Sequence, residues 1–196
     1  MGIGEELGKQ AICVVCMDDI RPMKFTSIFH DINPSLQVYY KRHTDNDIVS
    51  FISSRDNGIQ GIILTGSKYR INTPGSPSPD KALLNLGIPV LGICYGFQWL
   101  TKVSGGKVCT FSDGRLHNYH KLLSVLDVPR KLYRFTHHDY ICKLAKGWKP
   151  LIQHESQIWM AIDPKSRHIG IQFHPEKRKA SRVFFETWLK YIGRVK

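Results

Sequence analysis

The chain has 196 residues, 42% of them hydrophobic, which is typical of one soluble α/β domain. No apolar run reaches the roughly 18 residues of a membrane-spanning helix, which excludes a membrane protein of that kind. The formal net charge of +12 fits an acidic partner, but the basic residues are scattered and accompany no nucleic-acid motif, so a nucleic-acid role is not expected.

The start of the chain lacks the patterns of a targeting signal. A signal peptide would place a basic stretch before a hydrophobic one, and N-myristoylation would require Ser or Thr at position 6, where the chain has Glu6. We therefore expect residues 1–10 to be a flexible N-terminus, residues 11–196 to form one domain, and the protein to be cytoplasmic.

Five cysteines are scattered along the chain, an odd number that does not suggest a disulfide framework. Cys13 and Cys16 form a C-x-x-C pattern inside an apolar run that is typical of a buried strand. Residues three apart on a strand point to opposite faces, and no second pair completes a zinc site. We therefore expect core cysteines in a reducing compartment, with no metal and no cofactor.

Strand-like and helix-like segments alternate, which predicts an α/β fold with a largely parallel central sheet flanked by helices. In the first part of the chain we expect strands at residues 11–17, 58–65 and 87–93, and a short helix at residues 47–55. Pro, Ser and Gly are frequent over residues 68–80, which predicts a loop, and we expect it to be flexible.

Further along, the pattern predicts a helix at residues 97–104, closed by Gly105 and Gly106. Several shorter strands follow, and the last of them covers residues 168–173. Apolar residues recur at a helical period over residues 179–192, which predicts a C-terminal helix. No repeat, heptad pattern or linker divides the chain.

The most informative segment is Gly92-Ile93-Cys94-Tyr95-Gly96, between a predicted strand and a predicted helix. It is the cysteine form of the G-x-S-x-G strand-to-helix turn known from serine hydrolases. The two glycines relieve clashes in a sharp turn that lifts the Cys94 sulfur clear of the sheet. The start of the helix favours a thiolate at this place. The pattern therefore predicts a nucleophilic cysteine.

The run from Gly92 to Gln98 resembles the active-site motif of class I glutamine amidotransferases, most closely that of the glutaminase part of GMP synthases. Thr136-His137-His138-Asp139 is similar to the family's Ser-His-x-Asp stretch, and Phe173-His174-Pro175-Glu176 to its His-Pro-Glu. The resemblance covers nearly the whole chain from about residue 11. It implies a flavodoxin-like α/β fold with a nucleophile elbow.

A cysteine nucleophile usually needs a histidine that takes and returns protons. His174 follows an apolar strand, and the carboxylate of Glu176 can hold its imidazole and stabilise the charged form. Together with the family's order of Cys, His and Glu, this predicts a catalytic triad of Cys94, His174 and Glu176. His137 and His138 are the next candidates for the base.

Two backbone N–H groups are expected to bind the oxyanion of the reaction. Tyr95, the residue after the nucleophile, supplies one, and the resemblance places the other at Ser67. The chain has Gly66-Ser67-Lys68 where the family usually has Gly-Gly-Pro, so Ser67 would be strained if the loop needed a positive φ.

The resemblance also implies residues that bind glutamine, and these are Gly66, Gln98, Thr136 and His137. The contributions of Thr136 and His137 come from their backbone. An alternative stays open, in which Gln98 caps or packs the elbow helix and His137 is an ordinary loop residue.

The resemblance implies a glutaminase that hydrolyses L-glutamine to glutamate and ammonia through a cysteinyl thioester. It also implies a separate ATP-dependent synthetase subunit of GMP synthase type, because this chain has no Gly-rich phosphate loop. The loop at residues 68–80 and the basic stretch at residues 177–182 are the candidate interface. Two alternatives stay open: a γ-glutamyl hydrolase or peptidase on the same fold, and a non-catalytic relative that binds a partner or metabolite.

Overall fold

The computed structural model describes residues 10–18 and 23–193, and the expectations for residues 1–9 fall outside these ranges. Among the described residues, no helix combines the length and the apolar character that crossing a membrane demands. In the same ranges, no three His, Cys, Asp or Glu side chains gather in a way that could hold a metal ion.

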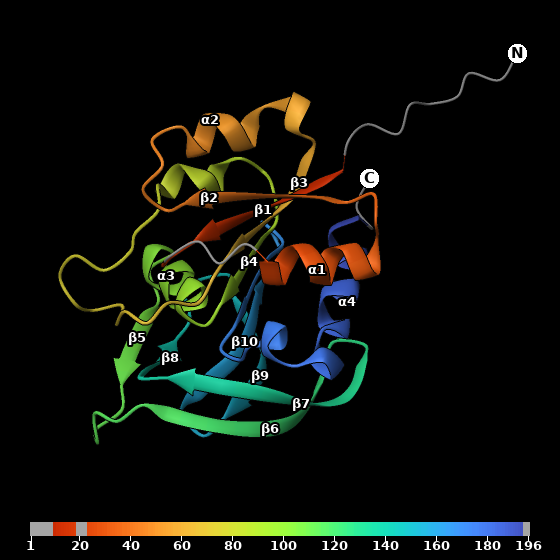
Figure 1. Ribbon diagram of the computed structural model, residues 1–196. Coiled ribbons are helices and arrows are strands. Elements are labelled where there is room, and N and C mark those ends of the chain that lie inside the picture. The colour runs from red at the N-terminus through yellow and green to blue at the C-terminus, as the bar shows by residue number, and fades with distance from the viewer. Residues whose placement is uncertain (1–9, 19–22, 194–196) are drawn as a thin grey trace, which may run out of the picture.

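A nine-stranded sheet forms the centre of the molecule, and five neighbouring strands in it run parallel (Figure 1). In order across the sheet they are β2 (Gln37–Arg42), β1 (Ala11–Cys16), β3 (Ile59–Leu64), β4 (Val90–Ile93) and β11 (His168–Ile171). The strands β1, β4 and β11 are buried along their whole length, as expected for continuous apolar strands covered on both faces. The predicted α/β fold is confirmed, and this strand order is flavodoxin-like.

Beyond β11 the sheet continues in antiparallel strands. These are β10 (Gln157–Asp163), β8 (Asp139–Lys143) and β5 (Lys107–Thr110), while β9 (Lys149–His154) pairs with β10. A separate hairpin of β6 (His117–Val125) and β7 (Val128–His137) lies along the bottom of Figure 1. A bridge between Arg134 of β7 and His174 attaches the hairpin to the segment that follows β11.

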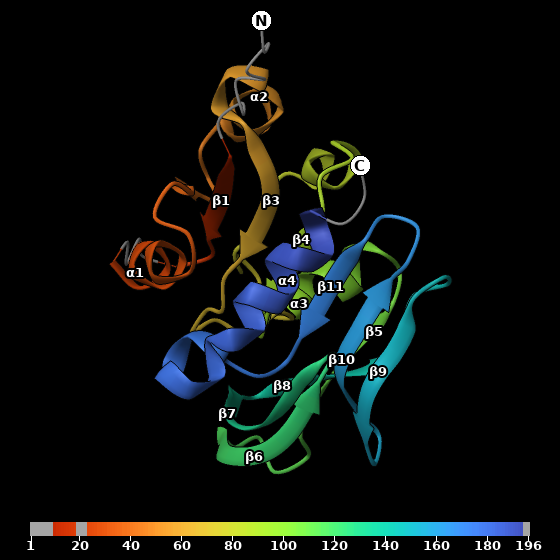
Figure 2. The same ribbon diagram turned by 90° about the vertical axis from the view of Figure 1, so that its right-hand side faces the viewer.

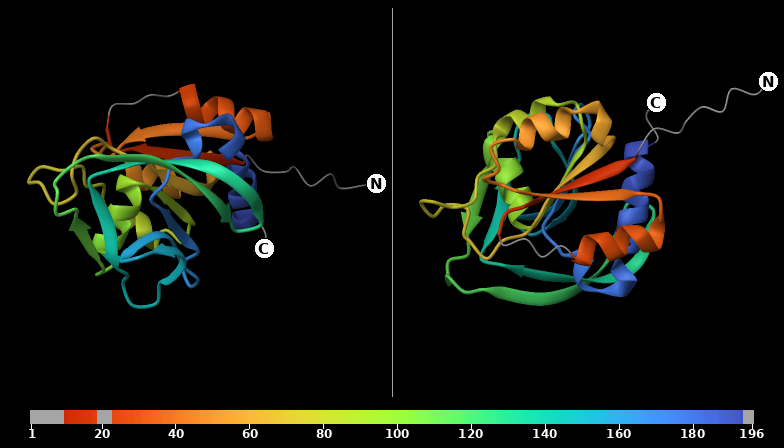
Figure 3. Two further views of the ribbon diagram at one scale, coloured as in Figure 1. Left: turned by 90° about the horizontal axis from the view of Figure 1, so that it is seen from below. Right: turned by 45° about the horizontal axis from the view of Figure 1, so that its top comes forward.

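Helices cover both faces of the sheet (Figures 2 and 3). On one face, α1 (Met23–Ile32), α4 (Val183–Gly193) and the β6–β7 hairpin share a core with Ile12 and Val14 of β1. On the other face, α2 (Ile48–Ser53) and α3 (Tyr95–Val103) share a core with Cys13 and Val15. Alternate residues of β1 therefore enter two separate cores, as the two-residue period of a strand requires.

Most predicted elements are confirmed with shifted ends. The helix predicted at residues 97–104 begins earlier, at Tyr95, directly after Cys94. The C-terminal helix predicted at residues 179–192 is a 3₁₀ turn at Lys179–Ser181 followed by α4. Residues 68–80 contain no helix or strand, as predicted. Neither α1 nor β2 was predicted from the sequence, although Phe25, Ile28, Phe29 and Ile32 of α1 recur at a helical spacing.

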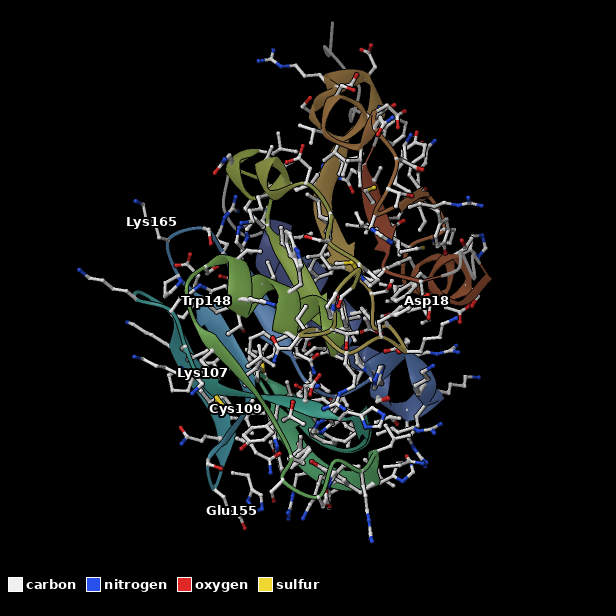
Figure 4. The ribbon with its side chains drawn as sticks, turned by 90° about the vertical axis from the view of Figure 1, so that its left-hand side faces the viewer. Asp18, Lys107, Cys109, Trp148, Glu155 and Lys165 are labelled. Atoms are coloured by element: carbon white, nitrogen blue, oxygen red, sulfur yellow. A yellow bond between two sulfur atoms is a disulfide. The ribbon has the colours of Figure 1, made fainter. Side chains whose placement is uncertain are left out.

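The expectation that the cysteines form no disulfide is wrong. Cys109 of β5 and Cys142 of β8 form a disulfide (Figure 4). Because β5 and β8 are antiparallel neighbours, residues 33 positions apart in sequence have Cα atoms 5.8 Å apart, within the range that a disulfide needs. Cys13 and Cys16 are free and buried in the two opposite cores, as predicted.

Candidate active site

Cys94 occupies the turn between β4 and α3. Its backbone lies at φ 52° and ψ −104°, a strained conformation for a residue with a Cβ. A Cβ on Gly92 would lie 2.7 Å from the backbone carbon of Gly96, and a Cβ on Gly96 would collide with the carbonyl oxygen of Leu64. The Cys94 N–H donates to the carbonyl of Ile171 at 2.7 Å. The chain therefore forms the sharp strand-to-helix turn that the glycine spacing predicts.

His174 lies just beyond β11, and its Nδ1 is 2.7 Å from Oε1 of Glu176. Both side chains are only 9% exposed. Burial disfavours the imidazolium, but the Glu176 carboxylate and the Cys94 sulfur outweigh it and raise the pKa of His174 to about 10. Burial also favours a neutral Glu176, yet the His174 charge holds the pKa of Glu176 below its usual value. The two side chains therefore form a buried ion pair at neutral pH.

The Cys94 sulfur faces groups from three parts of the chain. Its Sγ is 3.5 Å from the carbonyl oxygen of Thr136 and 3.5 Å from Nε2 of Gln172. A hydrogen bond with Cys94 contributes to the raised pKa of His174. A Cβ on Gly66 would lie 3.0 Å from Cε1 of His174 and 3.6 Å from Cβ of Cys94. The structure thus brings these predicted site residues together, and it adds Gln172.

The predicted oxyanion donors are Ser67 and Tyr95. Ser67 lies shortly after β3, and Tyr95 is the first residue of α3. Ser67 is not among the described non-glycine residues with a positive φ, so the strain considered for it does not arise. Its Oγ accepts a hydrogen bond from the N–H of Tyr69 at 3.1 Å. The Tyr95 hydroxyl donates to the carbonyl of Pro77 at 2.7 Å. The use of the two backbone N–H groups for an oxyanion stays a prediction.

The side chains of Gln98 and His137 are each already hydrogen-bonded within the protein. Gln98 Nε2 donates to the carbonyl of Asp139 at 2.8 Å and is 3.4 Å from Oε1 of Gln172. His137 Nδ1 is 3.1 Å from the same Asp139 carbonyl. For Gln98 this contact favours the alternative in which it packs the elbow helix. Glutamine binding by either residue stays a prediction.

A cavity of about 390 Å³ opens beside the ion pair of His174 and Glu176. Its lining includes five of the predicted site residues and four further charged residues, namely Gly66, Ser67, Thr136, His174, Glu176, Asp18, Lys68, Arg134 and Lys177. Asp18 is labelled in Figure 4. Charges of both signs therefore line this cavity beside the ion pair.

The loop at residues 68–80 is tied to β8 through Asp139. The Asp139 side chain is 2% exposed and accepts from Thr110 Oγ1 at 2.6 Å and from Arg70 Nη2 at 3.4 Å. Ser76 Oγ donates to the carbonyl of Arg70 at 2.8 Å. No role was predicted from the sequence for Asp139 or Gln172. The available signal for Gln172 was a polar residue between the apolar Ile171 and Phe173, in a segment predicted to be a strand.

The comparisons with known proteins agree with this geometry. A family model of the class-I glutamine amidotransferases matches residues 24–186. The chain therefore belongs to the class I glutamine amidotransferase family. The enzymes named GMP synthase (glutamine-hydrolyzing) from Staphylococcus aureus strains JH9 and Newman are each 36% identical over 129 residues. That match covers 61% of this chain and 24% of each relative, so the chain spans about a quarter of these curated relatives.

Solved structures show the same fold at low sequence identity. A protein described as one of the subunits of a GMP synthase, from Thermoplasma acidophilum, has a TM-score of 0.67 at 18% identity, and the match covers 95% of both chains. PurLQS from Thermotoga maritima has a TM-score of 0.67 at 16% identity, over 94% of this chain and 99% of that chain. The family and the GMP synthase relatives support a cysteine-dependent glutamine amidotransferase.

Proposed function

We propose that the chain is a glutaminase that hydrolyses L-glutamine to glutamate and ammonia, with Cys94 as nucleophile, His174 as acid and base, and Glu176 as the group that orients His174. One observation carries the proposal. A strained cysteine at the start of α3 lies beside a buried histidine whose Nδ1 is 2.7 Å from a carboxylate. Nucleophile, base and orienting group in this relation serve acyl transfer.

The first step forms a thioester. The Cys94 sulfur, as thiolate, bonds to the carboxamide carbon of glutamine, and the carbonyl electron pair moves onto the oxygen. When the C=O bond re-forms, the C–N bond breaks, and the leaving nitrogen takes a proton from His174 and departs as ammonia. The raised pKa of His174, about 10, keeps the imidazolium available as this acid. The N–H groups of Ser67 and Tyr95 are the proposed donors to the oxyanion.

The second step hydrolyses the thioester. Neutral His174 takes a proton from a water molecule as the water oxygen bonds to the thioester carbon. The resulting tetrahedral species collapses, the C–S bond breaks, and glutamate leaves. The Cys94 thiolate and the His174 imidazolium are then restored. Glu176 stays ionised throughout and stabilises each imidazolium that forms.

The ammonia is proposed to pass to a separate ATP-dependent synthetase subunit of GMP synthase type. The Staphylococcus aureus relatives support this partner, because they are named GMP synthase and the match takes in only 24% of their length. The described residues contain the groups for hydrolysis, and we identified no phosphate loop in the sequence. We also propose that residues 11–196 form a single domain. The proposed location of the protein is the cytoplasm.

The test is glutamate production by purified variants, followed with a coupled dehydrogenase. We expect Cys94→Ala and His174→Ala to lower turnover by more than about a thousandfold, and Glu176→Gln to lower it less, because orientation is a smaller effect than proton transfer. Cys13→Ala is the matched control, since it also removes a buried free thiol but lies in β1, in the other hydrophobic core from Cys94.

Glutamate production that survives in Cys94→Ala would refute the assignment of the nucleophile. Near-normal turnover in His174→Ala would move the base to another residue, with His137 and His138 next in line. A wild-type protein that cleaves γ-glutamyl peptides faster than glutamine would favour the γ-glutamyl hydrolase. A wild-type protein that turns over neither substrate, alone or with a synthetase, would favour a binding protein.

A further inference from the structure

The side chain of Gln172 is fully buried and is in direct contact with the Cys94 sulfur. Its Nε2 is 3.5 Å from Sγ, and the residue is 0% exposed. The parallel register of β4 and β11 produces this contact: Ile93 pairs with Ile171, so the next residues along, Cys94 and Gln172, lie beside each other. The Cys94 N–H to Ile171 carbonyl bond, 2.7 Å long, fixes that alignment.

The orientation of the Gln172 amide follows from its neighbours. The Asp139 carbonyl oxygen can only accept, so the Gln98 group that lies 2.8 Å from it must be the NH₂ group. That same NH₂ group is 3.4 Å from the Gln172 amide and requires an acceptor there, which is Oε1. The NH₂ group of Gln172 is left to face the sulfur. Gln98 therefore sets which end of Gln172 the nucleophile meets.

The second contact of the Cys94 sulfur is with a hydrogen-bond acceptor rather than a donor. The Thr136 carbonyl oxygen, 3.5 Å away, can accept a hydrogen bond from the S–H group of a thiol. It has no hydrogen to donate to a thiolate. A donor on the other side gains strength when the sulfur becomes negative, because hydrogen bonds to charged groups are the stronger ones. In the buried turn, where water is excluded, that donor has few competitors.

We propose that Gln172 is a further catalytic residue of this site, whose side-chain amide donates a hydrogen bond to the Cys94 thiolate and stabilises it before attack. This inference rests on the proposed glutaminase function. Gln98 acts through Gln172 and is a positioning residue in this inference. The charged or titratable groups near the sulfur are His174 and Glu176 from the segment after β11, and His137 and Asp139 from β7 and β8.

The test is the alkylation of Cys94 by iodoacetamide in the absence of glutamine, followed by mass spectrometry of the Cys94 peptide across a pH series. Gln172→Met keeps the length of the side chain and removes the donor. We expect it to be alkylated about tenfold more slowly at neutral pH, the effect of one hydrogen bond to a charged group, with the whole profile moved to higher pH. Its kcat for glutamine should fall by a similar factor while KM changes little.

Two further variants separate a catalytic role from a structural one. Gln98→Met frees the Gln172 amide to turn, so slower alkylation than in the wild type is expected although Gln98 does not touch the sulfur. Gln153→Met, on the exposed part of β9, is the control for the substitution itself and should leave the profile unchanged. Melting temperatures of all variants show whether each protein is folded.

A folded Gln172→Met protein with a wild-type alkylation profile would overturn the inference. If Gln172→Met does not fold, a folded Gln98→Met protein with a wild-type profile overturns it as well. A wild-type protein that hydrolyses no glutamine, but whose alkylation slows in Gln172→Met, would contradict the proposed function and leave the Gln172 contact supported.

Discussion

At the scale of single residues, the site depends on positions where the backbone allows little choice. Cys94 has a Cβ at φ 52°, and Gly92 and Gly96 leave no room for one. Gly170 of β11 is equally restricted, because a Cβ there would lie inside the ring of Phe97. The glycines let α3 approach the sheet closely, and this approach places the sulfur beside the segment that follows β11.

His137 makes the stability of the protein depend on pH. Burial is the main cause that lowers the pKa of His137 from 6.5 to about 4, and its side chain is 3% exposed. The unfolded chain therefore binds a proton between pH 6.5 and 4 that the folded protein does not. The stability linked to this residue is complete above pH 6.5 and is lost as the pH falls toward 4, by about 3 kcal/mol in all.

We expect His137→Gln to flatten this loss of stability, measured as the free energy of unfolding in urea at pH 7 and pH 5. His168, whose pKa burial also lowers, contributes in the same direction in both proteins, so the difference between them reports His137. Phe135→Leu, in the same cluster of rings, is the control and should lower the stability equally at both pH values. Parallel pH curves for the wild type and His137→Gln would contradict the prediction.

At the scale of elements, the sequence predicted those features that a pattern within a few residues determines. The apolar runs of β1, β3, β4 and β11 and the glycine-flanked turn at Cys94 have signals within a few residues, and they were identified. The Cys109–Cys142 disulfide was missed because it depends on the register of β5 and β8, which have no signature in the sequence. The contact between Gln172 and Cys94 was missed for the same reason, since it follows from the pairing of β4 and β11.

The disulfide between β5 and β8 should stabilise the fold. It closes a loop with a sequence separation of 33, for which restriction of the unfolded chain is worth about 3–4 kcal/mol. We expect dithiothreitol to lower the melting temperature of the wild type, and the double variant Cys109→Ser with Cys142→Ser to melt at that lower temperature with or without the reductant. Equal melting of oxidised and reduced wild-type protein would show that the link adds no stability.

At the scale of the whole molecule, the +12 charge bears on the proposed partner. Arg178 and Lys179 are exposed and follow directly on the segment that contains His174. An acidic synthetase surface could dock there, and such steering weakens with salt. We expect slow glutamine turnover by the chain alone, and a stimulation by a purified GMP synthase-type synthetase with ATP and acceptor that decreases at high salt.

Charge reversal tests the place of docking. Arg178→Glu with Lys179→Glu should reduce the stimulation about tenfold more than it reduces the turnover of the chain alone. Lys146→Glu with Lys149→Glu is the matched control, because these exposed residues flank Trp148, on the side of Figure 4 away from Asp18. Full turnover by the isolated chain, unchanged by any synthetase, would end the coupling proposal.

The position of β11 in the sheet has a consequence for the order of folding. This strand lies between β4 and β10, in the middle of the sheet, yet it is the last strand in the described part of the chain. During synthesis, β4 and β10 exist before the strand that joins them, and the proposed nucleophile Cys94 is made about 80 residues before the proposed base His174. Such long-range pairing is slow to form, and the edges of β4 and β10 stay unpaired until β11 has been made. The newly made chain therefore needs its last strand for two purposes at once, to close the sheet and to complete the site.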